Sequence, residues 1–232
     1  MKKRSYYFFL LIFLILMILS LISILLWGYD NHKTSEIVKR EEVHLIQKED
    51  TYSLERQIMN DNIDTVGWII VPGTNINYPV VQYEDNSYYL NHDFDNQLNS
   101  SGWIFLDSNN QMTDHNLVLY GHHRRDGSMF GSIDLLFNPN FYSQEREIIW
   151  ITLDETIHYT VFSVYKTNPS DSYHDLNFSS FKEKTNEFFN KSEISILETM
   201  EEPSQILTLS TCHDNNRDRL VVHAYKKNER NA

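Results

Sequence analysis

The feature that most limits how this chain can fold is a run of 22 residues without a charge, residues 6 to 27. The run is apolar apart from two serines. A run of about 18 apolar residues is already long enough to form a membrane-spanning helix. A cleavable signal peptide is the alternative, because Lys2, Lys3 and Arg4 precede the run. Its apolar core, however, is only about 7 to 15 residues long and ends at a small-residue cleavage site. We therefore expect an uncleaved membrane anchor.

The three positive charges before the anchor predict its orientation, because basic residues favour the cytoplasmic side. The remainder of the chain should then lie outside the cell, with the protein crossing the cell membrane once. The expected parts are a cytoplasmic N-terminus (1–5), a transmembrane anchor (6–27), a stalk (28–50) and an extracellular domain (51–232).

The charge of the exported part argues against one class of partner. The formal net charge of the chain is -12, and residues 1 to 27 contribute +3, so residues 28 to 232 carry about -15 (-12 minus +3). Such a surface repels a phosphate backbone, and the sequence has no basic patch or nucleic-acid motif. We expect no nucleic-acid partner.

Eight strand-like runs dominate the exported part. They are rich in Ile, Val, Tyr, Trp and Phe and are bounded by Asn, Asp, Gly and Pro. They cover residues 66–71, 76–83, 102–107, 116–121, 146–153, 156–167, 205–211 and 219–226. Eight strands suit a small closed β-barrel with an interior filled by side chains. At this length one hydrophobic core is typical. The fold class is therefore mostly β, with peripheral helices.

Three helices are expected around the barrel. An amphipathic helix is indicated at 52–62, a short one at 130–137, and a third after Ser180, which forms a capping-box pattern with Glu183. One face of the third helix gathers apolar residues and should cover the barrel: Phe181, Thr185, Phe188 and Phe189.

The chain contains a single cysteine, Cys212, at the end of a strand-like run. In an oxidising compartment a lone thiol cannot form an intramolecular disulfide. It is therefore paired between molecules, buried and inert, or reactive. Alternation along this run places one set of side chains on one side and the rest on the other: Ile206, Thr208, Ser210 and Cys212 against Leu207, Leu209 and Thr211. In the following run it separates an apolar face, Leu220, Val222 and Ala224, from the opposite face, Arg219, Val221, His223 and Tyr225.

An antiparallel hairpin would bring Arg219 close to Cys212. The next strand begins at Arg219 after a six-residue connection, "HDNNRD". Beside a nucleophile a guanidinium can hold a substrate carbonyl or a developing oxyanion. A surface ion pair with Asp214 or Asp218 is the alternative role for this arginine.

A cysteine nucleophile also needs an acid/base partner, and histidine is the usual one. His122 ends the strand "NLVLYGHH", where Gly121 gives backbone freedom, and can face a cleft. His213 and His223 are poorly placed, and His123, His92, His115, His158 and His174 are expected to be turn or surface histidines. Neighbouring His side chains point apart and no second cysteine exists, so we expect no metal site.

These residues resemble a known family. "TLSTC" followed by "RLVVHA", with "LVLYGHH" upstream and an N-terminal anchor, is similar to class B sortases, the cysteine transpeptidases of Gram-positive cell surfaces. The resemblance covers roughly residues 50 to 227. It implies an eight-stranded barrel with N-terminal helices, Cys212 as nucleophile, His122 as acid/base and Arg219 as the catalytic arginine. A second arginine, Arg217, lies in the connection "HDNNRD" just before Arg219. The preference for Arg219 over Arg217 as the catalytic arginine rests on the "RLVVHA" match.

The resemblance also implies a reaction, with no cofactor. The Cys212 thiolate would attack a threonine carbonyl in the C-terminal sorting motif of a secreted surface protein, which forms a thioester. An amine of peptidoglycan or its lipid-linked precursor would then resolve the thioester. The segment "NPSDSYHDLNF" is where recognition of the motif is expected. Another extracytoplasmic cysteine peptidase, an L,D-transpeptidase and a non-catalytic anchored binding barrel remain as alternatives.

Overall fold

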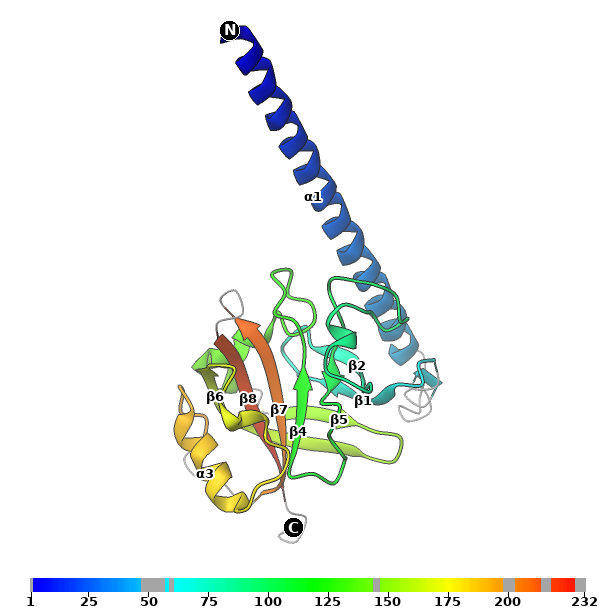
Figure 1. Ribbon diagram of the computed structural model, residues 1–232. Helices are drawn as coiled ribbons and strands as arrows, with labels where there is room; N and C mark the ends of the chain where they lie inside the picture. The colour runs from blue at the N-terminus through cyan, green and yellow to red at the C-terminus, as the bar shows by residue number, and fades with distance from the viewer. Residues whose placement is uncertain are drawn as a thin grey trace.

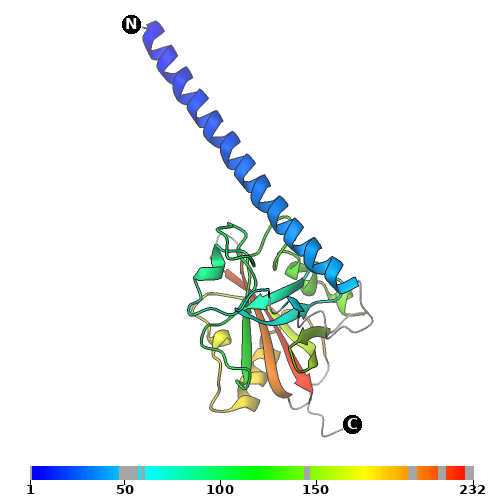
Figure 2. The same ribbon diagram turned by 90° about the vertical axis from the view of Figure 1, so that its right-hand side faces the viewer.

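A computed structural model describes residues 2–46, 57–58, 61–143, 147–197, 203–213 and 218–227. A long helix, α1 (Lys2–Ile46), projects from a β-barrel (Figures 1 and 2). Most of the helix expected at 52–62 lies outside the described residues. Residues 57 and 58 are helical, and Ile58 is buried.

The eight predicted strands are present and close into a barrel. Their bounds are β1 Thr65–Ile70, β2 Asn77–Val81, β3 Phe105–Leu106, β4 Asn116–Tyr120, β5 Glu147–Ile151, β6 Thr156–Thr167, β7 Pro203–His213 and β8 Asp218–Lys227. The order around the barrel is β1-β2-β3-β4-β7-β8-β6-β5, and β5 pairs with β1 to close it. The predicted fold class is confirmed.

One strand is much shorter than its sequence pattern predicts. A strand was expected over 102–107, but β3 has two residues. Gly102 has a φ of 58°, and the backbone N–H of Trp103 donates to the carbonyl of Tyr89. This part of the chain therefore bonds to the short 3-10 helix Tyr88–Leu90 instead of extending the sheet.

Alternation along β7 and β8 divides their side chains between two hydrophobic clusters. Leu207, Leu209 and Leu220 belong to the cluster inside the barrel. Ile206 and Val221 belong to a second cluster on the outer face of these strands. The faces predicted for the described residues of both strands are thus confirmed.

Helix α3 (Phe181–Lys191) covers the outer face of β6 and β8, as Figure 1 shows. It begins as predicted at Ser180, whose hydroxyl accepts a hydrogen bond from the backbone N–H of Glu183 at 3.4 Å. Its own residues Thr185 and Phe188 are buried on the face that packs against the barrel. Four 3-10 helices complete the described regular structure: η1 Tyr88–Leu90, η2 Ile133–Phe137, η3 Pro139–Ser143 and η4 Ser172–His174. The short helix expected at 130–137 corresponds to η2.

Helix α1 has two parts that differ in their surroundings. Its stretch Phe9–Lys39 is long and apolar enough to cross a membrane, and the apolar side chains from Phe9 to Trp27 are exposed. Further along, Thr34 and Ile37 are buried against the barrel domain, and Lys33 pairs with the fully buried Asp93 at 2.8 Å. The helix therefore continues without a break from the apolar run to the barrel.

Candidate active site

The ends of β4, β7 and β8 bring the three predicted site residues together in the fold. Tyr120 on β4 is the parallel partner of Ser210 on β7. His122 lies two residues after Tyr120, and Cys212 lies two residues after Ser210. In the antiparallel pairing of β7 with β8, Cys212 is opposite Arg219. The predicted hairpin is present, with both strands extending further into the connection than expected.

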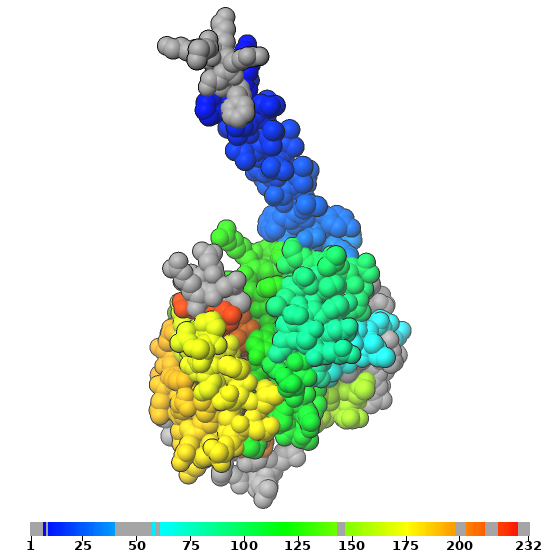
Figure 3. Space-filling model, viewed as in Figure 1, coloured from blue at the N-terminus to red at the C-terminus, as the bar shows by residue number. Residues whose placement is uncertain are grey.

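A pocket of about 320 Å³ opens at this end of the barrel, and both His122 and Arg219 line it. The other lining residues come from five parts of the chain: Asn86, Leu90, Phe105, Tyr120, Gly121, Pro169, Tyr173, His174, Ser210 and Thr211. Figure 3 shows the segment after β6 (yellow) beside segments of the β4 region (green) on the same face of the molecule. The pocket volume is within the range of about 300 to 1,000 Å³ typical of small-molecule sites.

His122 is held by backbone groups on both sides. Its Nε2 lies 2.7 Å from the carbonyl oxygen of Leu90, and its own carbonyl accepts from the N–H of Phe130 at 3.1 Å. The ring also packs close to Gly102, where an added Cβ would come 3.0 Å from His122 Cδ2. The imidazole is therefore fixed in place yet half-buried at the pocket.

Gly121 precedes His122 for a reason that the sequence did not reveal. Its φ is not positive, unlike that of Gly73, Gly102 and Gly127. A Cβ at position 121 would instead come 2.9 Å from the ring of Phe130. Close packing, and not backbone freedom, requires glycine here.

Arg219 lies on the outer face of β8, next to Tyr120 in the pocket. Its Nη1 donates to the carbonyl of Asp218 at 3.2 Å. Burial and the neighbouring Asp107 raise the pKa of Tyr120, and the positive charge of Arg219 opposes this shift. Arg219 thus places a positive charge in the pocket wall beside the Tyr120 hydroxyl, which itself stays neutral. Asp214 and Arg217 lie outside the described residues.

Two histidines that the sequence analysis excluded as the acid/base residue, His223 and His174, have defined positions in the fold. His223 is fully buried, with Nδ1 2.8 Å from the Thr208 hydroxyl and Nε2 3.0 Å from the Tyr165 hydroxyl. Burial lowers its pKa to about 3, so it stays neutral. His223 is not among the residues that line the pocket, as expected. His174, by contrast, was expected to be a turn histidine and lines the pocket.

The segment from residue 168 to residue 178 supplies one wall of the pocket and includes Tyr173. The Ser210 hydroxyl donates to the Tyr173 hydroxyl at 2.9 Å. The Asn116 side chain donates to the carbonyls of Tyr173 and Asp175 at 3.0 and 2.9 Å. This is the segment in which motif recognition was expected from the sequence. Among the described residues, no three His, Cys, Asp or Glu side chains gather as metal ligands would.

The comparisons with known proteins agree with this architecture. The model of the Sortase domain family matches residues 69–227. The chain belongs to the sortase family. Sortase B of Staphylococcus aureus is 36% identical over 161 residues, which cover 66% of this chain and 65% of that protein. Sortase B of Listeria monocytogenes is 29% identical over 175 residues, or 72% of this chain and 71% of that one. The chain thus spans about two thirds of the length of these curated relatives.

A solved structure extends the similarity to three dimensions. The Staphylococcus aureus sortase B–substrate complex matches with a TM-score of 0.75 and 29% identity, and the match covers 87% of this chain and 98% of that one. Relatives and structural neighbour alike are of class B, as the sequence predicted. Sortases are cysteine transpeptidases that anchor surface proteins to the cell wall. The apolar helix before this sortase domain is compatible with a membrane anchor.

Proposed function

We propose that this sortase cleaves a C-terminal sorting motif after threonine and transfers the acyl group to an amine of the cell wall, with Cys212 as the nucleophile. The observation that carries the proposal is the convergence of three strand ends. The β4–β7 register leads to His122 and Cys212, and the β7–β8 register pairs Cys212 with Arg219. His122 and Arg219 line one pocket.

The first half-reaction forms a thioester. The Cys212 thiolate attacks the threonine carbonyl carbon, and the carbonyl oxygen becomes an oxyanion. Arg219 stabilises this charge and orients the motif, because a guanidinium is positively charged and has several fixed donors. His122 donates a proton to the leaving amine when the peptide bond breaks.

The second half-reaction releases the product. An amine of peptidoglycan or of its lipid-linked precursor attacks the thioester, and His122 now accepts a proton from the attacking nitrogen. The thiolate of Cys212 is the leaving group, so the enzyme returns to its starting state. A related sortase B has been solved as a substrate complex, which supports a peptide-binding role for the equivalent face here.

The location of the reaction is part of the same proposal. Residues 1–5 lie in the cytoplasm, residues 6–27 cross the cell membrane, and residues 28–50 connect them to an extracellular catalytic domain, residues 51–232. The exposed apolar side chains of α1 and the positive residues before them support this orientation.

The test is incubation of the full chain in detergent micelles with sorting-motif peptides and candidate amines, read by mass spectrometry. The expected result is a thioester on Cys212 and, with the right amine, a peptide–amine product. The Cys212→Ala variant is the matched control and should form neither. Hydrolysis without amine incorporation would instead indicate a peptidase. Full surface-protein anchoring by Cys212→Ala in cells would indicate a non-catalytic binding barrel.

A further inference from the structure

The wall of the pocket between β6 and α3 has little regular structure of its own. Pro169, Tyr173 and His174 on this segment line the pocket. Only the three residues of η4 are helical, and the segment belongs to no strand of the barrel. One backbone hydrogen bond, from the N–H of Asn116 to the carbonyl of Leu176 at 3.0 Å, ties it to β4, and side-chain contacts must supply the rest of its support.

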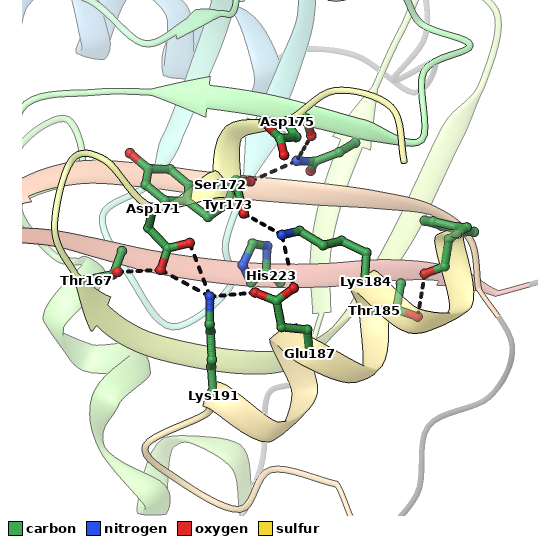
Figure 4. Close-up of polar contacts among 12 residues, drawn as sticks. Thr167, Asp171, Ser172, Tyr173, Asp175, Lys184, Thr185, Glu187, Lys191 and His223 are labelled. Carbon is green, nitrogen blue, oxygen red and sulfur yellow. Dashed lines mark hydrogen bonds and ion pairs between the residues drawn. The ribbon is translucent and has the colours of Figure 1, made fainter. Parts of the chain in front are cut away.

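On the outer side, charged residues of α3 bond to this wall (Figure 4). The Nζ atom of Lys191 lies 3.1 Å from both carboxylate oxygens of Asp171. The Nζ atom of Lys184 lies 2.5 Å from the hydroxyl of Ser172. Two consecutive residues of the wall are thus each bound by a lysine from α3.

A shared carboxylate links the two lysines. Glu187 accepts from Lys191 at 2.7 Å and from Lys184 at 3.1 Å. We call the group Asp171, Lys184, Glu187 and Lys191 the α3 ion cluster. Because Lys184, Glu187 and Lys191 lie on successive turns of α3, the helix is a rigid support for both contacts.

The cluster is charged at neutral pH. Burial would raise the pKa of Asp171, but hydrogen bonds from Thr167 and Lys191 outweigh it and the net shift is downward. Burial would lower the pKa of Lys191, but Glu187 and Asp171 shift it upward overall. His223 lies beneath α3 with its ring stacked on Phe188 at 3.9 Å, and it is neutral, so it adds no competing charge.

We propose that the α3 ion cluster is a positioning device that holds the pocket wall ready for the acyl-donor peptide, with Lys184 and Lys191 as positioning residues. The inference rests on the proposed function of the pocket. A wall that is fixed in advance does not have to be ordered when the peptide binds, which strengthens binding. Cys212, His122 and Arg219 lie on other segments, so the chemical step does not depend on the cluster.

The chain offers closely matched variants. Lys191→Met and Lys184→Met remove the charge but keep an unbranched apolar stem, which matters because the lysines also lie over the rings of Tyr165 and Phe188, at 5.7 and 5.1 Å. Lys191→Arg retains the charge. Lys182→Met, at an exposed position of the same helix, is the control.

Two measurements on the full chain in detergent micelles test the proposal. The first is amide hydrogen exchange of residues 168–178, which needs no substrate. The second is steady-state cleavage of an uncharged fluorogenic peptide with threonine before the scissile bond. For Lys191→Met we expect exchange of the wall to rise about fivefold and KM to rise about fivefold, as partly exposed ion pairs are worth about this factor. The value of kcat should stay within about twofold.

The remaining variants test whether the effect depends on the positive charge of the cluster lysines. Lys191→Arg and Lys182→Met should retain the wild-type KM and exchange. High salt should raise the KM of the wild type toward that of Lys191→Met and leave the variant unchanged, because salt screens exposed charges. Unchanged exchange and KM in both Met variants would overturn the proposal. So would a parallel fall of kcat and thermal stability, which would indicate a purely structural role. If no peptide forms a thioester on the wild type, the proposed function fails, whereas the exchange measurement still tests the cluster.

Discussion

His122 and Leu90 form a hydrogen bond in which the Nε2 atom of the imidazole lies 2.7 Å from the Leu90 carbonyl oxygen. A carbonyl oxygen only accepts, so Nε2 carries the hydrogen in this bond. In the neutral ring Nδ1 is then the nitrogen that is free to take a proton. Leu90 also lines the pocket, so one residue both orients the candidate base and borders the substrate site.

Replacing His122 with a residue that donates a hydrogen bond but does not transfer a proton separates the structural role of the side chain from its role in catalysis. In His122→Gln the side-chain amide can still donate to the Leu90 carbonyl. We expect kcat to fall about 10²- to 10⁴-fold, the usual contribution of general acid–base catalysis, with an unchanged melting temperature. Peptide cleavage and thermal unfolding measure the two effects. A loss of less than about tenfold would show that another group carries the proton.

The same hydrogen bond predicts the tautomer of His122. The neutral ring should carry its hydrogen on Nε2, because Leu90 supplies an acceptor there. Nitrogen-15 NMR of the histidine-labelled chain distinguishes the two tautomers, and His122→Gln identifies the signal. A neutral ring with its hydrogen on Nδ1 would contradict the assignment.

Arg219 is predicted to act on the oxyanion, so its loss should lower kcat more than it raises KM. For Arg219→Ala we expect a fall in kcat of about 10²- to 10³-fold, comparable to the loss of an oxyanion donor elsewhere. Arg219→Lys should recover only part, since an ammonium lacks the planar fork of a guanidinium. Arg217→Ala is the control and should be nearly silent. If Arg217→Ala is the damaging change, the assignment between the two arginines is reversed.

Local patterns account for what the sequence predicted correctly. Alternating β-branched and aromatic residues identify the strands, and alternation in 206–211 and 219–225 assigns the faces that pack inside the barrel or under α3. A short connection between two strand-like runs predicts their hairpin, which pairs Cys212 with Arg219. These inferences need only neighbouring residues.

Non-local contacts explain what sequence reasoning missed. The parallel register of β4 and β7 joins Tyr120 to Ser210 across a long stretch of chain, and no local pattern specifies it. His174 lines the pocket from the three-residue helix η4, which is too short to give a periodic sequence pattern, so nothing distinguished it from other turn histidines. The hydrogen bond from the Trp103 N–H to the Tyr89 carbonyl, which takes the chain away from the sheet before β3, also exists only in the folded chain.

Buried His223 predicts a loss of stability in mild acid. Burial lowers its folded-state pKa to about 3 from the ordinary histidine value of 6.5, so below pH 6.5 the unfolded chain binds a proton that the folded chain does not. Stability from this group is therefore complete above pH 6.5 and is lost as the pH falls toward 3. The loss is at most about 1.4 kcal/mol per pH unit.

Denaturant unfolding of the wild type and His223→Gln between pH 7 and about pH 4.5 measures this loss above the range where most carboxylates titrate. The variant should be less stable at neutral pH but should vary less with pH. The lowered pKa of Asp171 adds a separate loss only at lower pH, below its unfolded value of 3.8, because its folded form favours the charged state. Equal pH slopes for the two proteins would contradict the neutral buried imidazole.

Gly102 is predicted to be essential for both the fold and the base. Its φ of 58° disfavours any side chain, and a Cβ there would come 2.6 Å from the Tyr89 carbonyl and 3.0 Å from His122 Cδ2. Gly102→Ala should cost about 1 to 3 kcal/mol of stability, since strain and a backbone clash add. The added Cβ would also come 2.8 Å from the Leu90 carbonyl oxygen, which orients His122. We expect this carbonyl to be displaced, so kcat should fall as well. Gly28→Ala, where a Cβ meets nothing within 4 Å, is the control for both measurements. Full activity and stability of Gly102→Ala would mean that the histidine does not depend on this close contact.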